Sequence, residues 1–144
     1  NYYYLNFGMR YSLQREIIKK IVCSTKSHPT ADWIYSEAKK KINNISLGTV
    51  YRNLKTLEDL GSIKLIYDQN QVKYDGNTKE HHHLKCSECG ILIDAEIKSD
   101  FNKDKIIKEY NFEPESTNFF IIGKCKKHKN TKNKKQGVIN GTSR

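Results

Sequence analysis

The order of hydrophobic and polar positions predicts three short helices in the first 61 residues. After Ser12, a residue type favoured at helix N-caps, apolar side chains recur with helical spacing until about residue 24. Thr30 can cap a second helix that ends by residue 43, and Ser46 can cap a third that stops before Gly61. We expect the inward side chains of these helices to include Leu13, Ile17, Ile21, Ile34, Ala38, Leu47, Val50, Leu54 and Leu57.

After the third helix the pattern changes to one typical of strands. Residues 63–67 and 72–75 flank a polar turn and predict a β-hairpin. Farther along, the chain favours a small α/β arrangement with a helix between its last two strands. The strands are expected at residues 81–86, 91–97 and 117–122, and the helix at residues 102–110.

These elements predict an α+β fold with two domains. Three helices followed by a hairpin indicate a winged helix-turn-helix domain at residues 1–75. Residues 76–80 are the expected linker, and residues 81–128 form the expected small α/β domain. The lysine- and asparagine-rich residues 129–144 contain few apolar side chains, so we expect a disordered basic tail.

The net charge of +10 is unevenly distributed along the chain. Residues 1–61 carry ten Lys/Arg and five Asp/Glu (+5), residues 62–125 carry nine and eleven (−2), and residues 126–144 carry seven and none (+7). A basic first half suits contact with phosphates, and a slightly acidic middle suits cation binding. The charge pattern therefore favours a nucleic-acid partner for the first half.

The compartment and the state of the cysteines are linked. No apolar run approaches the roughly 20 residues of a membrane-spanning helix, and residues 1–7 are too short and tyrosine-rich for a signal peptide. We therefore expect a cytoplasmic protein whose cysteines are reduced thiols or metal thiolates. Cys23 lies in an apolar helical pattern and is expected in the core.

The other cysteines form a pattern that predicts a structural zinc site. Cys86 and Cys89 make a Cys-x-x-Cys pair, and Cys125 and His128 repeat the same spacing. Three thiolates and one imidazole match tetrahedral Zn²⁺, and four protein ligands leave no position open for catalysis. A redox pair is the alternative, but the second half-site and the absence of a strand-to-helix setting disfavour it.

A second group of candidate ligands offers nitrogen and oxygen but no sulfur. It contains His28, Asp75, His81, His83 and Asp94. Such a set prefers a divalent ion such as iron, manganese or zinc. His81 and His83 alternate along a strand and share a face, whereas His82 points to the other face. Each residue alone is as well explained by a turn or a solvated side chain, so the hypothesis depends on one ion joining the two domains.

The third helix presents a candidate DNA-reading surface without acidic residues before its last turn. Its outward positions are Thr49, Arg52, Asn53, Lys55 and Thr56. Arg52 can pair with guanine and Asn53 with adenine in a major groove, and Lys64 and Lys73 on the hairpin are candidates for phosphate contacts. An ordinary solvated helix face is the alternative, and the position before a hairpin in the basic half favours DNA.

Two other classes of function compete with a DNA-binding regulator. A zinc hydrolase or deaminase would need a His-Glu-x-x-His helix or a His-x-Glu before Pro-Cys-x-x-Cys, and the sequence has neither, so we expect no enzyme. A zinc-ribbon binder of RNA or protein would draw its affinity from the basic residues 126–144, which carry +7. Removing residues 129–144 separates these hypotheses, because a regulator keeps sequence-selective binding without the tail.

Four segments resemble signatures of the ferric uptake regulator (Fur) family, and the resemblance extends from about residue 8 to residue 128. Residues 12–15 (Ser-Leu-Gln-Arg) are similar to the family's first helix start, and residues 28–35 (His-Pro-Thr-Ala-Asp-Trp-Ile-Tyr) to its second-helix signature. Residues 46–54 resemble its recognition helix, and residues 81–90 its metal-rich strand and zinc knuckle.

The resemblance implies a homodimeric, metal-responsive transcription factor that binds inverted repeats in double-stranded DNA. It places Tyr51, Arg52 and Asn53 near bases and Arg15 near the backbone. The implied DNA-contacting set is Arg15, Ser46, Thr49, Tyr51, Arg52, Asn53 and Lys55. The implied zinc ligands are Cys86, Cys89, Cys125 and His128, and the implied regulatory ligands are His28, Asp75, His81, His83 and Asp94, which would hold Fe²⁺, Mn²⁺ or Zn²⁺.

Aspartates at positions 75 and 94 resemble the peroxide-sensing PerR branch more than the iron-sensing branch, where glutamate is usual. In that branch, bound ferrous iron reacts with peroxide, a ligand histidine gains oxygen, and DNA is released. His28 and His81 are the candidates here. The alternative is an iron- or zinc-uptake regulator without peroxide sensing. The chain departs from the family pattern at His128, where a fourth cysteine is expected.

Overall fold

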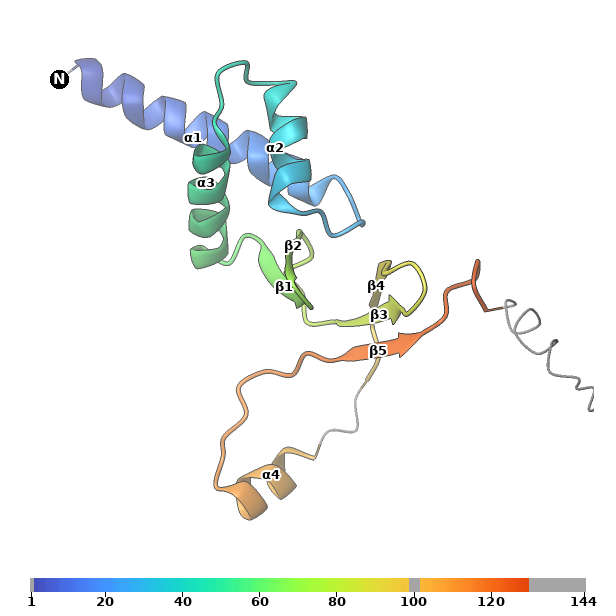
Figure 1. Cartoon of the computed structure of the whole chain (residues 1–144). Coiled ribbons are helices and arrows are strands. Elements are labelled where there is room, and N and C mark those ends of the chain that lie inside the picture. Colours follow the sequence, from blue (N-terminus) through green and yellow to red (C-terminus); the bar gives the residue numbers. More distant parts are fainter. Residues whose placement is uncertain (1, 99–101, 130–144) are drawn as a thin grey trace, which may run out of the picture. The chain divides into compact units, whose positions relative to one another are not determined.

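A computed structural model describes residues 2–98 and 102–129 of the chain. The chain divides into two compact units, the first ending at Glu80 and the second beginning at His81 (Figure 1). The first unit contains the helices α1 (Tyr2–Cys23), α2 (Ala31–Lys39) and α3 (Leu47–Asp59). The hairpin of β1 (Lys64–Asp68) and β2 (Gln71–Asp75) follows, so this unit is a winged helix-turn-helix.

The ends of the helices are fixed by the capping residues that the sequence predicts. The Thr30 hydroxyl accepts the backbone N–H of Trp33, and the Ser46 hydroxyl accepts that of Thr49. These bonds satisfy amide groups that have no partner inside the helix. After α3, Gly61 adopts a left-handed conformation with φ of 64°, which turns the chain toward the hairpin.

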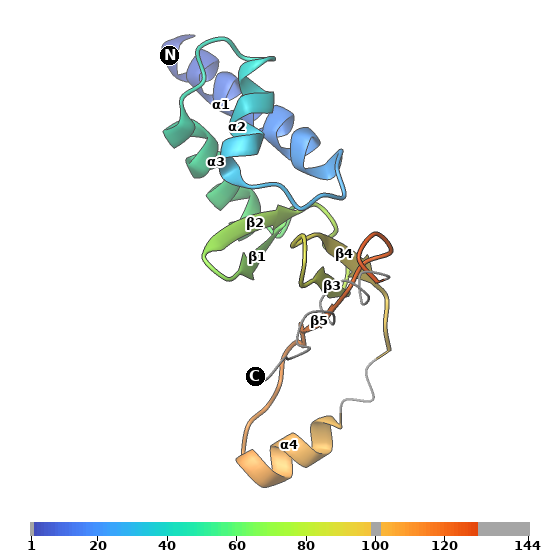
Figure 2. The ribbon, with the colours of Figure 1, turned by 45° about the vertical axis from the view of Figure 1, so that its right-hand side comes forward.

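One hydrophobic core holds the first unit together. It is built from the inner faces of the three helices and from residues of the hairpin region (Figure 2). Its buried members are Ile18, Ile21, Val22, Ala31, Ile34, Ala38, Ile45, Val50, Leu54, Leu57, Ile63 and Tyr74. The helix α3 is therefore held rigidly by α1 and α2, because closely packed cores resist displacement of one element.

Four sequence predictions about these helices are wrong. The helix α1 begins at Tyr2 rather than after Ser12, because no proline interrupts the earlier residues and the helix continues through the serine. Leu13 and Leu47 are 63% and 36% exposed, since both lie beside the inward stripe rather than on it. Cys23 is also exposed, because it follows Ile21 and Val22 at the end of α1 and points away from the core.

The loop between α1 and α2 is attached to strand β2. The backbone N–H of Tyr74 donates to the Pro29 carbonyl at 2.9 Å, and Thr30 and Lys73 form an isolated antiparallel bridge. These bonds bring the residue before Pro29 close to the end of β2. Long-range backbone pairing of this kind joins segments that are far apart in sequence.

The second unit contains a small mixed sheet in its described residues. Strand β3 (His82–Cys86) lies in the middle, antiparallel to β4 (Leu92–Ala95) and parallel to β5 (Phe120–Gly123). The helix α4 (Lys103–Tyr110) lies between β4 and β5 in the chain, as the sequence predicts, and the Asn102 side chain caps it by accepting the Lys105 backbone N–H. Residues 130–144, most of the predicted basic tail, lie outside the described residues.

This second unit buries little apolar surface. Among its described residues, the buried hydrophobic side chains are Cys86 and Leu92, and α4 has none. Figures 1 and 2 both show α4 lying apart from the sheet. A domain that buries so little must obtain stability from bonds other than its own hydrophobic contacts.

Among the helices of the described residues, none combines the length and apolar character that crossing a bilayer requires.

The core of the first unit gives a direct test. We expect Leu54→Ala to lower the free energy of unfolding by about 2 to 5 kcal/mol, because Leu54 is fully buried and truncation leaves a cavity. Leu60→Ala is the matched control, because Leu60 is 64% exposed. Urea denaturation of the full chain measures both, and equal losses for the two variants would contradict the described core.

Candidate metal centres and helix surface

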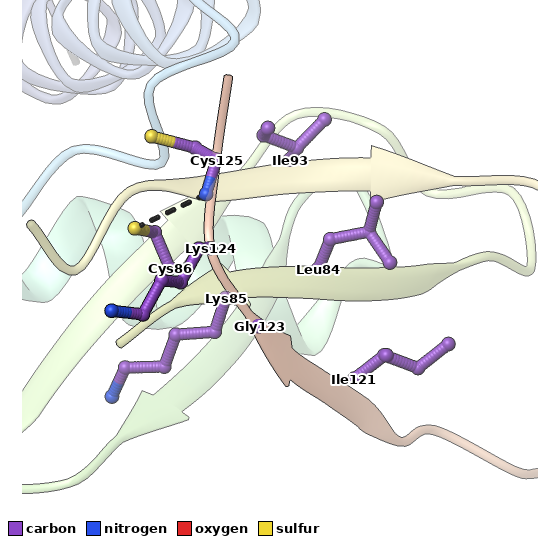
Figure 3. Close-up of a pocket in the computed structure, with 8 residues that line it drawn as sticks. All are labelled: Leu84, Lys85, Cys86, Ile93, Ile121, Gly123, Lys124 and Cys125. Carbon is purple, nitrogen blue, oxygen red and sulfur yellow. Dashed lines mark hydrogen bonds between the residues drawn. The ribbon is translucent and has the colours of Figure 1, made fainter. Parts of the chain in front are cut away.

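One group of metal ligands lies entirely within the second unit. Cys86 and Cys89 flank the turn after β3, and Cys125 and His128 follow β5. Because β3 and β5 are adjacent and parallel, both segments leave the same edge of the sheet. The four potential ligand atoms lie within 4.8 Å of one another. Figure 3 shows Cys86 and Cys125 side by side at this edge, where the Cys125 backbone N–H donates to Cys86 Sγ at 3.4 Å.

The spacing of these atoms fits a tetrahedral zinc ion. Zinc bonds of about 2.3 Å to sulfur and about 2.0 Å to nitrogen imply S···S separations of about 3.8 Å and S···N separations of about 3.5 Å. The Cys89 and Cys125 sulfurs are 3.9 Å apart, and His128 Nδ1 lies 3.6 Å from Cys86 Sγ and 3.2 Å from Cys125 Sγ. The histidine therefore occupies the place of a fourth thiolate without distorting the group.

The surroundings of Cys86 favour its thiolate. Backbone N–H groups of Cys125, Cys89 and Glu88 point at its sulfur and lower the pKa of Cys86 from 9.0 to about 5, although burial opposes the shift. Hydrogen bonds to a charged form stabilise that form. At neutral pH, Cys86 is therefore already in the state that binds zinc, and no proton has to be displaced from it.

A different group of ligands lies on the other face of β3. His81 Nε2 and His83 Nε2 are 3.1 Å apart, which is the shared face that strand alternation predicts. Asp94 on β4 is the antiparallel partner of His83, and its Oδ1 lies 3.5 Å from His81 Nε2 and 3.7 Å from His83 Nε2. Two bonds of about 2.1 Å to one ion put neighbouring donors about 3.0 to 3.4 Å apart. The histidine pair lies in this range, and Asp94 Oδ1 lies a few tenths of an ångström beyond it, so a small side-chain movement brings all three atoms to one ion.

The first unit contributes a smaller group of the same chemistry. His28 Nε2 lies 3.9 Å from Asp75 Oδ2, and both side chains are buried. His28 has a φ of 51°, a left-handed conformation that is uncommon for a residue with a side chain. The attachment of Pro29 to β2 holds His28 in this conformation opposite Asp75. Backbone strain of this kind concentrates at functional sites.

The donor sets of these groups match their expected ions. Imidazole nitrogen and carboxylate oxygen suit Fe²⁺, Mn²⁺ or Zn²⁺, while the sulfur-rich set suits zinc. Among the described residues, the second unit offers a group of three nitrogen and oxygen ligands, and the first unit offers a group of two. Neither number fills the coordination of such an ion without further ligands.

His82 has a separate role, as its position in the strand predicts. Its ring stacks on Phe119 with centroids 3.7 Å apart, on the face opposite His81 and His83. It belongs to neither group of candidate ligands. Sequence pattern did not identify Phe119 as its neighbour, because the strand expected at residues 117–122 gives no indication of which strand it pairs with.

The exposed surface of α3 differs from the predicted one at Asn53. This side chain is 2% exposed, and its Nδ2 donates to the Thr49 carbonyl at 2.9 Å, so it faces the core and cannot read a base in this conformation. Tyr51 and Arg52 are exposed. Arg52 donates to the Thr49 hydroxyl at 3.1 Å, and the Ser46 hydroxyl lies 2.9 Å from the same atom, so a polar chain lines the start of the helix.

Several candidate phosphate contacts are held by neighbours within the unit. Lys55 pairs with Asp59 at 2.9 Å and Glu58 at 3.2 Å, and these carboxylates raise its pKa. Lys73 is paired with Asp68 at 2.8 Å. Lys64 donates to the Lys79 carbonyl at 2.8 Å. Each lysine would have to break one of these contacts before it could bind a phosphate. Each would therefore add less to the affinity for a nucleic acid than the sequence suggests.

The fold and the ligand groups together define a class of protein. Its members have a winged-helix unit followed by a second unit that carries a sulfur-rich ligand group and further nitrogen and oxygen ligands. The comparison with family models is specific. Residues 6–122 match the ferric uptake regulator family. The chain belongs to this family.

Known relatives and solved structures agree with this membership. Over 88 residues, the chain is 41% identical to the peroxide-responsive repressor PerR of Staphylococcus epidermidis, a match that covers 60% of this chain and 59% of that protein. The aligned segment thus spans about three fifths of the relative's length. The peroxide stress regulator of Campylobacter jejuni superposes with a TM-score of 0.71 at 30% identity, covering 85% and 93% of the two chains. The iron-containing ferric uptake regulator of Francisella tularensis gives 0.65 at 25% identity, covering 79% and 89%.

The sulfur-rich group predicts a stability role for zinc. We expect the purified chain to hold zinc and Cys86→Ser to lose it, because three ligands remain. Loss of zinc should raise amide hydrogen exchange in β3, β4 and β5 while leaving the helical core protected. Cys23→Ser is the matched control, since Cys23 lies outside both ligand groups. If Cys86→Ser retains both zinc and protection of the sheet, this role is wrong.

Proposed function

We propose that this chain is a metal-dependent, DNA-binding transcriptional regulator that acts as a homodimer. The observation that carries the proposal is the division of the nitrogen and oxygen ligands between the DNA-binding unit and the second unit. An ion that needs ligands from both units couples its own binding to the orientation of the DNA-binding unit. Family membership and the PerR relatives support the same conclusion.

We propose that one Fe²⁺ or Mn²⁺ ion binds His28 and Asp75 together with His81, His83 and Asp94. The chain itself restricts how far these groups can separate. Asp75 and His81 are six residues apart, so they lie within about 21 Å even when the segment is fully extended. Completing the coordination of the ion therefore favours the arrangements in which the two units approach.

In this proposal α3 enters the major groove of an inverted-repeat operator. Tyr51 and Arg52 supply the exposed side chains for base contacts. Ser46, Thr49 and Arg15 contact the phosphate backbone of the DNA. Lys55 adds a phosphate contact once it leaves its carboxylate partners. Asn53 orders the helix from inside rather than reading a base.

The second unit supports a homodimer through its exposed apolar face. Leu84, Ile93 and Ile121 occupy one row across β4, β3 and β5, and Figure 3 shows them lining one surface. Ile93 and Ile121 are 44% and 42% exposed. A second copy is the occupant that would bury this row and α4 on both chains at once, with the zinc group holding the strands in place.

We further propose that peroxide inactivates the regulator. Ferrous iron held by these ligands would activate peroxide. One peroxide oxygen would then be added to a ligand imidazole, which supplies both electrons, and the other would leave as water. His28 and His81 are the side chains whose rings would be oxidised, as the family resemblance implies, and each has Nε2 within 4 Å of a carboxylate of the proposed ligand set. An oxidised ring binds the ion poorly, so the two units separate and the operator is released. Aspartate at both carboxylate positions and the PerR relatives support this branch over metal-uptake regulation.

The metal dependence of DNA binding has a direct test. We expect the zinc-loaded chain to bind a palindromic duplex in Mn²⁺, and His28→Ala to weaken that binding by more than about tenfold, since a ligand is lost. His82→Phe is the matched control, because it keeps the ring on Phe119 and removes no candidate ligand. Fluorescence anisotropy measures the affinities. Binding that ignores both Mn²⁺ and His28→Ala would refute the coupling.

Peroxide sensing has its own test. We expect peroxide to abolish duplex binding by the Fe²⁺-loaded chain and to add oxygen to the peptide containing His28 or His81. The Mn²⁺-loaded chain is the control, because Mn²⁺ reduces peroxide poorly at such a site. Peptide mass spectrometry and anisotropy on the same samples give the result. If the chain loses DNA binding while its histidines stay unmodified, the histidine mechanism is wrong, and oxidation of the zinc cysteines becomes the explanation.

A further inference from the structure

The Asp75 carboxylate is oriented by a turn that immediately follows it. Its Oδ1 accepts the backbone N–H of Asn77 at 2.7 Å, and its Oδ2 lies 3.9 Å from His28 Nε2. The two oxygens therefore have different neighbours. The first is bonded to the main chain, and this bond fixes the direction in which the second points.

Gly76, inside this turn, lies against the end of α1. A Cβ added at Gly76 would lie 2.8 Å from Cys23 Cα, 3.2 Å from Cys23 N and 3.0 Å from Cys23 Sγ. Two of these atoms are main chain in the last residue of a helix, so they cannot rotate away as a side chain could. Any residue larger than glycine at position 76 must push β2 and α1 apart.

We infer that Gly76 and the backbone N–H of Asn77 are positioning elements for the Asp75 ligand. The contact between Gly76 and α1 sets where the turn lies, and the Asn77 N–H sets which way the carboxylate faces. This inference rests on the proposed function of His28 and Asp75 as ligands of a divalent ion. It adds two residues to that site that no metal-ligand pattern in the sequence would identify, because neither offers a side-chain donor to the ion.

The same contact relates the ligand to the DNA-binding helix. Cys23 ends α1, and Ile18 and Val22 of α1 pack in the core with Leu54 of α3. The turn that aims Asp75 thus rests on the helix that also supports α3. A displacement at Gly76 moves the ligand relative to this support without removing any ligand.

The test titrates Mn²⁺ into the zinc-loaded full chain and follows free Mn²⁺ by electron paramagnetic resonance. We expect Gly76→Ala to weaken Mn²⁺ binding by about tenfold or more, as losses of supporting contacts around ligands do. Gly48→Ala is the matched control, because a Cβ at Gly48 meets nothing closer than 3.6 Å. Zinc content and thermal unfolding without Mn²⁺ separate an effect on the site from an effect on the fold.

A second pair of variants acts at Asn77, which is half-buried, and does not depend on the tight contact between Gly76 and α1. Asn77→Pro removes the N–H that holds Asp75, and Asn77→Ala keeps it. We expect the proline variant to lose Mn²⁺ affinity and the alanine variant to retain it, with equal zinc content. This pair decides the question if Gly76→Ala does not fold.

The outcomes distinguish the inference from the function on which it rests. If wild type binds Mn²⁺ no better than Asp75→Asn does, the proposed metal site itself is wrong. If wild type binds Mn²⁺ through Asp75 while Gly76→Ala and Asn77→Pro bind it as tightly, the positioning role is wrong and the metal site stands.

Discussion

A divalent ion bound through nitrogen and oxygen needs more ligands than the described residues of either unit supply at one place. The second unit brings three donor atoms together within 3.7 Å of one another, and the first brings two to 3.9 Å. We propose that this shortage is what makes the protein responsive. Because the full ligand set requires both units, the free energy of metal binding would favour one orientation of the DNA-binding unit. Damage to one ligand would weaken metal binding and remove this preference.

The two kinds of ligand divide two tasks. The described second unit has Cys86 and Leu92 as its buried hydrophobic residues, so its sheet depends on bonds that burial does not provide. The sulfur-rich group joins the ends of β3 and β5, and the lowered pKa of Cys86 keeps it ready for zinc. The nitrogen and oxygen group can hold several kinds of divalent ion, and the described residues of each unit supply only part of its ligands. Stability and response can therefore rest on different metals.

The sequence predicts the parts of this arrangement that follow from local periodicity and spacing. The caps at Thr30 and Ser46, the stop at Gly61 and the hairpin are where the pattern puts them, because each depends on a few neighbouring residues. Three predictions are wrong: that α1 starts after Ser12, that Cys23 lies in the core and that Asn53 faces outward. These features depend on packing between elements rather than on the period of the sequence. The support of His28 and Asp75 by backbone pairing has almost no sequence signal. The Asp-Gly-Asn sequence after the second predicted hairpin strand indicates a turn there, but it does not indicate which segment the turn contacts.

The most direct measurement is an anomalous difference map from crystals of the zinc-loaded chain grown with Mn²⁺. It reports the position of the ion and the identity of every ligand without reference to DNA binding or oxidation. The account predicts one manganese peak at bonding distance, about 2.2 Å, from nitrogen of both His28 and His83. A manganese ion bound to His81, His83 and Asp94 with water in place of His28 and Asp75 would contradict the proposal that one ion joins the two units.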